Sequence, residues 1–81
     1  MQIDERFYKE LSKFPKTDQL KIVNAVEFLI VDPYVGDIQK IKGEKDTWRR
    51  RIGSYRIFYE IHQNKNIIHL FWVERRKTNT Y

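Results

Sequence analysis

Three arginines and one phenylalanine, Arg49, Arg51, Arg56 and Phe58, are spaced so that they can share one face of a β-hairpin. Guanidinium groups bind phosphate through two hydrogen bonds at once, and an aromatic ring gives a nucleic-acid base a stacking surface. Like charges placed opposite each other destabilise a hairpin, so the Arg51–Arg56 pair indicates a functional role for this face. We interpret this face as a surface for an anionic, planar ligand. The alternative is a solvated basic face in which Glu60 partly neutralises Arg49.

The element that must position these side chains is a hairpin over residues 48–62. Gly53-Ser54 has the glycine-first pattern of a type II′ turn, and its flanks are rich in aromatic and β-branched residues. A two-residue loop fixes the register. The predicted pairs are Ile52 with Tyr55, Arg51 with Arg56, Arg50 with Ile57, Arg49 with Phe58 and Trp48 with Tyr59. The face opposite the arginines is then apolar, interrupted only by Arg50.

A short helix is predicted near the start of the chain, over residues 4–13, after a stub of strand at residues 1–3. Its apolar positions recur at helical spacing, and Pro15 ends it. These positions are Phe7, Leu11 and Phe14, with Tyr8 alongside.

A second helix should begin at Thr17 or Asp18, either of which can cap it, and run to about Val31 before Asp32-Pro33 breaks it. Its predicted core side consists of Ile22, Val23, Ala25, Val26, Leu29 and Ile30. Phe28 falls among polar residues, and we favour a local packing site for it over a contact surface.

The remaining strands are read from apolar runs between turns. Residues 38–41 form a short strand, and residues 42–46 form a polar loop. After a turn at residues 63–66, the continuous apolar run at residues 67–73 predicts a central strand. His69 interrupts that run, and we expect it to be a satisfied core histidine.

These elements define one domain over residues 1–81 with an α+β fold. The helices form an N-terminal hairpin packed on one face of a small antiparallel sheet, in the order β-α-α-β-β-β-β with a very short first strand. The apolar hairpin face meets the helices, and the arginine face stays open as a shallow basic surface.

The charge of the chain is unevenly distributed. Residues 1–39 hold five Lys or Arg and seven Asp or Glu, a net charge of −2, whereas residues 40–81 hold eleven and four, a net charge of +7. This asymmetry favours a polyanionic partner for the second half. There are no cysteines, and the two histidines are too few and wrongly spaced for a metal site. With no apolar run near ~20 residues and no visible signal peptide, we expect a cytoplasmic protein that does not enter a membrane.

The sequence resembles the RelE/ParE toxins of bacterial and archaeal type II toxin–antitoxin pairs. The resemblance rests on residues 40–43, on the Arg-x-Arg-Ile-Gly-x-Tyr-Arg pattern at residues 49–56, and on residues 73–76 with a late Tyr81. It implies a RelE-like fold and a cognate antitoxin that forms a hetero-oligomer with the toxin. For the RelE branch it implies ribosome-dependent cleavage of mRNA, by attack of the ribose 2′-OH on the phosphate, with no metal or other cofactor.

The resemblance also implies site residues. The family's catalytic positions match Arg49, Arg51, Arg56, Arg76 and Tyr81, with Arg75 as the alternative to Arg76. Beside them we expect Lys40, Lys42, Phe58, Arg75 and Lys77 to bind RNA. Arginine remains protonated at any physiological pH, so the arginines should stabilise charge rather than accept a proton. His62 lies roughly 20 Å along its strand from Arg56 and is not favoured as the base.

Three departures from the family pattern leave other functions open. The first strand is very short, Arg50 occupies a position that is usually apolar, and arginine replaces lysine at positions 49 and 51. The alternatives are a ParE-like inhibitor of DNA gyrase and an inactive module that binds nucleic acid or antitoxin.

Overall fold

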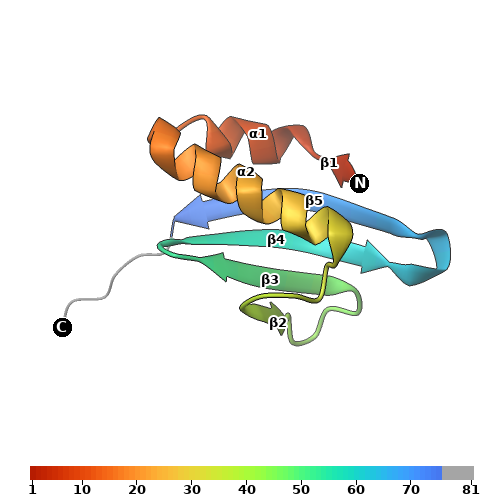
Figure 1. Cartoon of the computed structure of the whole chain (residues 1–81). Helices are drawn as coiled ribbons and strands as arrows, with labels where there is room; N and C mark the ends of the chain where they lie inside the picture. The colour runs from red at the N-terminus through yellow and green to blue at the C-terminus, as the bar shows by residue number, and fades with distance from the viewer. Residues whose placement is uncertain (76–81) are drawn as a thin grey trace.

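The computed structural model describes residues 1–75, within which two helices cover one face of a five-stranded sheet (Figure 1). In chain order the elements are β1 (Gln2–Ile3), α1 (Glu5–Leu11), α2 (Lys16–Val31), β2 (Ile38–Lys40), β3 (Thr47–Ile52), β4 (Tyr55–His62), the 3₁₀ turn η1 (Gln63–Lys65) and β5 (Ile67–Arg75). The strand order is β1-β5-β4-β3-β2. The predicted α+β fold is confirmed, but the sheet is mixed, because β1 runs parallel to β5.

The central hairpin forms with the predicted register. All five predicted pairs between β3 and β4 occur, from Ile52 with Tyr55 to Trp48 with Tyr59. Gly53 has a φ of +56° and the φ of Ser54 is not positive, which fits a type II′ turn. Local turn chemistry therefore sets which side chains share the open face.

The two helices begin at different kinds of N-cap residue. Asp4 caps α1, accepting a hydrogen bond from the backbone N–H of Arg6. The predicted caps of α2, Thr17 and Asp18, are wrong, because Pro15 occupies the N-cap and the helix begins at Lys16. Proline suits this position, since it has no N–H and the first N–H groups of a helix have no partner within it.

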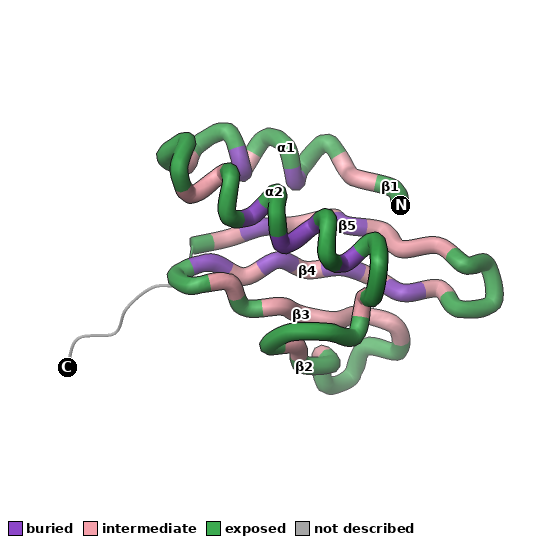
Figure 2. Tube along the Cα trace, viewed as in Figure 1, coloured by how far each residue is buried: buried purple, intermediate pink, exposed green. Residues whose placement is uncertain are grey.

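Helix α2 buries a narrower stripe than its apolar pattern indicates. Val23 and Ile30, expected in the core, are 39% and 58% exposed, and Phe28, expected to pack, is 63% exposed. Only one sheet layer lies beneath the helix, so its outer side has nothing to pack against (Figure 2). The outer side therefore keeps a row of exposed apolar side chains, which also includes Leu20 and Val31.

The core lies between the helices and the sheet. Its buried members are Phe7, Leu11, Ile22, Val26, Leu29, Tyr55, Ile57, Tyr59, Ile61, Leu70 and Val73. The two buried tyrosines keep their hydroxyls paired: Tyr55 donates to Asp18 at 2.6 Å and Tyr59 to the carbonyl of Pro33 at 2.9 Å. Burial raises the pKa of Tyr59 to about 12, so this hydroxyl stays neutral.

Strand β5 lies inside the sheet, as predicted, between β4 and β1. It is one place from the edge, and the edge strand β1 pairs with only two of its residues. A bulge opposite Phe58 and Tyr59 shifts the register, with Trp72 opposite Phe58 and Leu70 opposite Tyr59. His69 is not a core histidine: it pairs with Glu60 across the open face, where its side chain is 28% exposed. Side chains of this apolar run therefore lie on both faces of the sheet.

Candidate nucleic-acid interface

Arginine side chains gather on the sheet face opposite the helices, as predicted. Arg49, Arg51 and Arg56 share this face and line a hollow of about 140 Å³ with Asp37 and Gln39. Two of the three arginines come from alternate positions of β3, and the third faces them from β4. The hollow can therefore present several guanidinium groups to one anion.

Each of the two directly opposed arginines has a carboxylate partner that the sequence did not predict. The Nε atom of Arg51 lies 2.8 Å from a carboxylate oxygen of Asp37, and Nη1 of Arg56 lies 3.6 Å from one of Glu74. Arg49 donates a hydrogen bond to the side-chain oxygen of Gln39. These partners offset the repulsion between the arginines, and because exposed ion pairs are weak, a phosphate can displace them.

Asp37 is fixed to the hollow by its backbone as well as by its side chain. Its carbonyl accepts the backbone N–H of Arg51 at 2.9 Å. No sequence motif marks Asp37, because it lies in the connection after α2 and reaches β3 only through the fold. Glu74 could have been found by pairing the last strand with β4, which places it opposite Arg56.

Arg50, the residue that interrupts the apolar face, does not belong to the open surface. Its Nη1 donates to the carbonyl of Ala25 in α2 at 3.2 Å. Its guanidinium also lies against Gly36, where an added Cβ would stand 2.8 Å from Nε, and Gly36 has a φ of +101°. Arg50 therefore ties β3 to α2 and to the chain after it.

The structure separates the predicted RNA-binding residues. Phe58 lies on the open face opposite Arg49. Lys40 pairs with Trp48 and so belongs to the helix-side face, away from the arginines. Lys42 is exposed in the loop after β2, and Arg75 is exposed at the end of β5. Arg76, Lys77 and Tyr81 lie outside the described residues.

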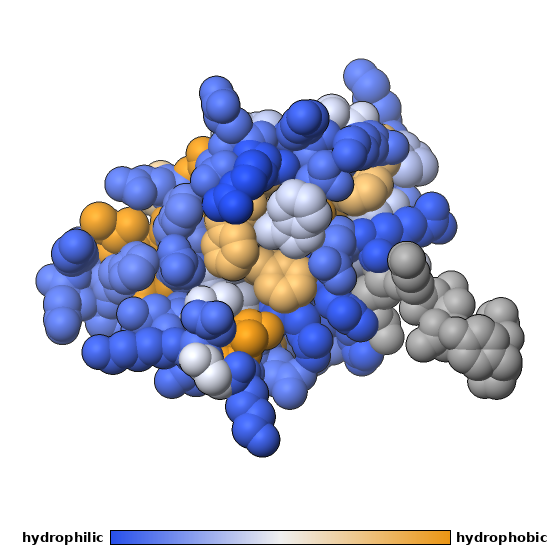
Figure 3. Space-filling model, turned by 180° about the vertical axis from the view of Figure 1, so that it is seen from behind, coloured by the Kyte–Doolittle hydropathy of each residue, from blue (hydrophilic) through white to orange (hydrophobic). Residues whose placement is uncertain are grey.

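Aromatic side chains extend the open face beyond Phe58. Trp72 lies opposite Phe58, and the rings of Phe58 and Phe71 are 6.4 Å apart between centroids. Figure 3 shows apolar side chains in the middle of this face with hydrophilic ones around them. Phe71 and Trp72 were not predicted here, because the bulge in β5 changes which residues face outward. The patch can stack nucleic-acid bases beside the arginines.

A chain of acidic and imidazole side chains crosses the same face next to the aromatic patch. Glu60 lies 3.1 Å from Nδ1 of His69 and 3.6 Å from Nε2 of His62, and His69 also lies 3.7 Å from Asp4. The hydrogen bond with His69, followed by that with His62, lowers the pKa of Glu60. Hydrogen bonds with Arg6 lower the pKa of Asp4 to about 2. His62 is thus held away from the arginine hollow, which it does not line.

Residues 1–75 contain no group of three or more His, Cys, Asp or Glu side chains placed to hold a metal ion. No helix in the same range is long and apolar enough to cross a membrane.

Comparisons with known proteins show which family shares this fold. RelE1 of Methanocaldococcus jannaschii is 29% identical over 80 residues, which cover 95% of this chain and 89% of the relative. The RelB-RelE antitoxin–toxin complex from Methanococcus jannaschii superposes with a TM-score of 0.78 at 25% identity, covering 93% of this chain and 90% of that one. The isolated RelE toxin of E. coli has a TM-score of 0.81 at 20% identity, covering 96% and 84%, a likeness of fold alone.

The fold, two helices on a five-stranded sheet, matches that of solved RelE toxins. A family model described as the ParE toxin of the type II toxin–antitoxin system, parDE, matches residues 2–80. The chain therefore belongs to this toxin family, within the RelE/ParE superfamily, which confirms the resemblance seen in the sequence.

Proposed function

We propose that this toxin is a ribosome-dependent endonuclease that cleaves mRNA and so inhibits translation. The observation that carries the proposal is the convergence of Arg49, Arg51 and Arg56 around one hollow on an open face. RNA contains its own nucleophile, the 2′-OH, so the protein need only align it with the phosphate and stabilise the developing charge. An aromatic patch beside the hollow supports binding of the neighbouring bases.

In this mechanism Arg51 and Arg56 bind the oxygens of the scissile phosphate, and Arg49 binds the adjacent nucleotide. We assign proton acceptance to Asp37, because it is the one carboxylate among the described residues that line the hollow. The 2′-oxygen forms a bond to phosphorus and its proton passes to Asp37. The bond from phosphorus to the 5′-oxygen breaks, and that oxygen takes a proton from water. The products are a 2′,3′-cyclic phosphate and a 5′-hydroxyl. Arg76 and Tyr81 keep the roles that the resemblance implies.

Asp37 and Glu74 form a matched pair for testing this assignment, since each carboxylate pairs with one arginine of the face. Asp37→Asn should lower single-turnover cleavage by about 10²-fold, the lower range for loss of general-base catalysis. Glu74→Gln should have a much smaller effect, because Glu74 does not line the hollow. Equal losses in the two variants would show that the carboxylates only position arginines.

The alternative activity is inhibition of DNA gyrase. We retain it because the matching family is described as the ParE toxin. One experiment separates the two. Translation in a cell-free extract with mapping of mRNA 5′ ends should show new ends within coding regions when the protein is added. Purified gyrase should supercoil DNA normally in its presence. Inhibited gyrase with intact mRNA would overturn the proposal.

We also propose a cognate antitoxin as the partner of this chain, because several solved relatives are RelB-RelE complexes. The chain has a net charge of +5 and leaves apolar side chains of α2 uncovered. An acidic segment with apolar residues, disordered alone, fits these surfaces. Co-purification with the product of the neighbouring gene should give a stable complex, and a failure to find any such partner would count against this assignment.

A further inference from the structure

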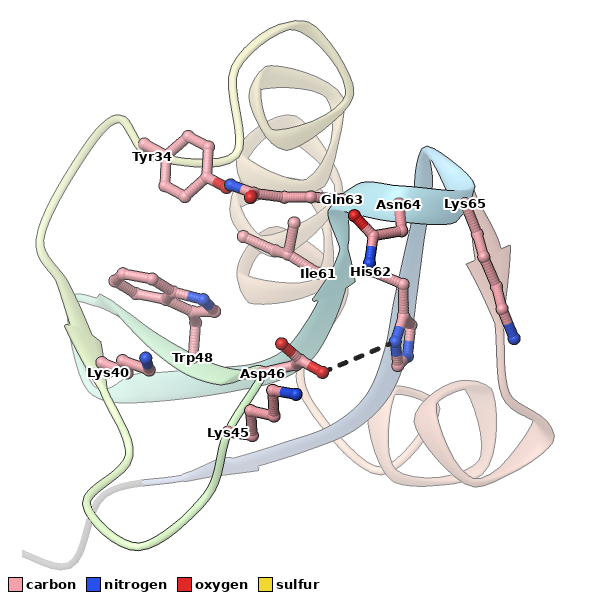
Figure 4. A pocket seen from close by; sticks show the side chains of 10 residues that line it. All are labelled: Tyr34, Lys40, Lys45, Asp46, Trp48, Ile61, His62, Gln63, Asn64 and Lys65. Carbon is pink, nitrogen blue, oxygen red and sulfur yellow. Dashed lines mark hydrogen bonds and ion pairs between the residues drawn. The ribbon is translucent and has the colours of Figure 1, made fainter.

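A second cationic hollow lies at the other end of the hairpin from the Gly53-Ser54 turn, away from the arginines. It has a volume of about 370 Å³, within the usual range for small-molecule sites. Its walls come from four parts of the chain: the segment after α2, strands β2 and β3 with their loop, the end of β4, and η1 (Figure 4). It shares no lining residue with the arginine hollow.

An aromatic wall is the first feature of this pocket that points to a ligand. The half-buried indole of Trp48 stands edge-on to the ring of Tyr34, with 5.6 Å between centroids. Tyr34 is held in turn by Gln63, whose amide donates to its hydroxyl at 2.5 Å. Because these contacts fix the rings before any ligand arrives, a planar ligand loses little extra entropy by stacking there.

Positive charge is the second feature. Lys40, Lys45 and Lys65 line the pocket, and none of them forms an ion pair within residues 1–75. Figure 4 shows the side chains of Lys40 and Lys45 on the side of Trp48 away from Tyr34. The one carboxylate of the lining, Asp46, is near His62, with 3.8 Å between Nδ1 and Oδ2. Lys65 lies farther off, on the other side of His62 from Trp48 (Figure 4). With three lysines against one aspartate, the lining has a net positive charge and favours an anion.

We propose that this pocket binds a nucleotide. The base stacks against Trp48, and the phosphate is held by Lys40 and Lys45, which bind it as mobile point charges. The amide of Asn64 and the carboxylate of Asp46 supply a donor and an acceptor for base edges or ribose hydroxyls. The ligand can be a free mononucleotide or one residue of an RNA strand, since the two share this chemistry.

The test follows the fluorescence of Trp48 in a Trp72→Phe background, so that a single indole reports. Adenosine 5′-monophosphate, ribose 5-phosphate and adenosine are titrated into the free protein. The monophosphate should bind about tenfold or more tightly than either fragment, because stacking and charge act together. Equal binding of ribose 5-phosphate would overturn the proposal, since it would reveal only a cationic surface.

Two single variants locate the site. Lys45→Ala should weaken binding of the monophosphate several-fold. Lys21→Ala is the control, because Lys21 is an exposed lysine of α2 that does not line the pocket. If both variants weaken binding equally, the pocket is not the site and the proposal fails.

The trinucleotide ApApA distinguishes the two sources of the ligand. Tighter binding than the monophosphate, with the same quenching of Trp48, assigns the pocket to an RNA strand, and equal affinity assigns it to a free nucleotide. The assay contains no ribosome and requires no cleavage. Its outcome is therefore independent of whether the arginine hollow is a nuclease site.

Discussion

Replacing Arg56 with alanine is the sharpest perturbation of the proposed cleavage site. Arg56 lies opposite Arg51 on the open face and carries one of the guanidinium groups that reach the hollow. Loss of one donor to a transition-state oxyanion typically costs about 10²- to 10³-fold in rate. At about 1.4 kcal/mol for each tenfold change, this is roughly 3–4 kcal/mol of transition-state stabilisation.

The same change should leave the fold almost as stable. Removing Arg56 relieves its repulsion with Arg51, but it also removes the ion pair with Glu74, whose atoms are 3.6 Å apart. Arg51 keeps its own partner, Asp37. These side chains are between 32% and 61% exposed, so solvent weakens both effects. The effects are also opposite in sign, and the free energy of unfolding should change by about 0.5 kcal/mol or less.

The assay is single-turnover cleavage of mRNA on programmed ribosomes, with thermal melts of the same protein samples. Lysine at position 56 is the graded control: it keeps the charge but not the bidentate geometry, and should recover part of the rate. Wild-type cleavage by Arg56→Ala would refute the role of this face. Cleavage of a substrate with a 2′-deoxy sugar at the scissile position would refute attack by the 2′-OH.

Three further outcomes follow from the described contacts. Tyr59→Phe removes the hydrogen bond to Pro33 and should cost about 0.5–1.5 kcal/mol of stability in urea unfolding. Because the pKa of Tyr59 is raised to about 12, wild-type stability should fall as the pH rises from 10 towards 12, and the variant should lose this dependence. The hydrogen bond with His69 lowers the pKa of Glu60. Ionised Glu60 therefore stabilises the fold above its unfolded-state pKa, and this stabilisation is lost as the pH falls through its folded-state pKa. Thermal melts of Glu60→Gln should show a smaller loss of stability at acid pH than those of the wild type. Arg75→Ala should weaken ribosome binding and reduce the slope of log affinity against log salt by about 1, whereas an affinity indifferent to salt would argue against a phosphate interface.

The hairpin shows how far local sequence reasoning reaches. A glycine-first two-residue loop has few ways to close, so it fixed the register and placed Arg49, Arg51 and Arg56 on one face. Burial is not set locally where a residue's neighbours come from distant parts of the chain. Helical spacing predicted burial of Val23 and Ile30, yet a helix over a single sheet buries only the stripe that faces the strands.

Other predictions were wrong because one extra residue in a strand changes which face of the sheet the side chains beyond it occupy. The bulge in β5 exchanged the faces of the residues before and after it, so that His69 faces the open surface and Trp72 joins Phe58. Lys40, expected to bind RNA, lies on the face opposite the arginines, because strand neighbours alternate in direction and Lys40 pairs with Trp48.

The sequence by itself determined the element types, the hairpin register, the basic second half and the toxin family, because these depend on periodicity, turn chemistry and local motif. Only the tertiary structure decided which groups surround the arginines. Asp37 reaches Arg51 from the connection after α2, and Glu74 reaches Arg56 from the last strand. It also decided that Lys40 and Trp48 share a pocket with residues of η1. Lateral contacts of this kind depend on strand order and loop paths, which no local pattern in the sequence specifies.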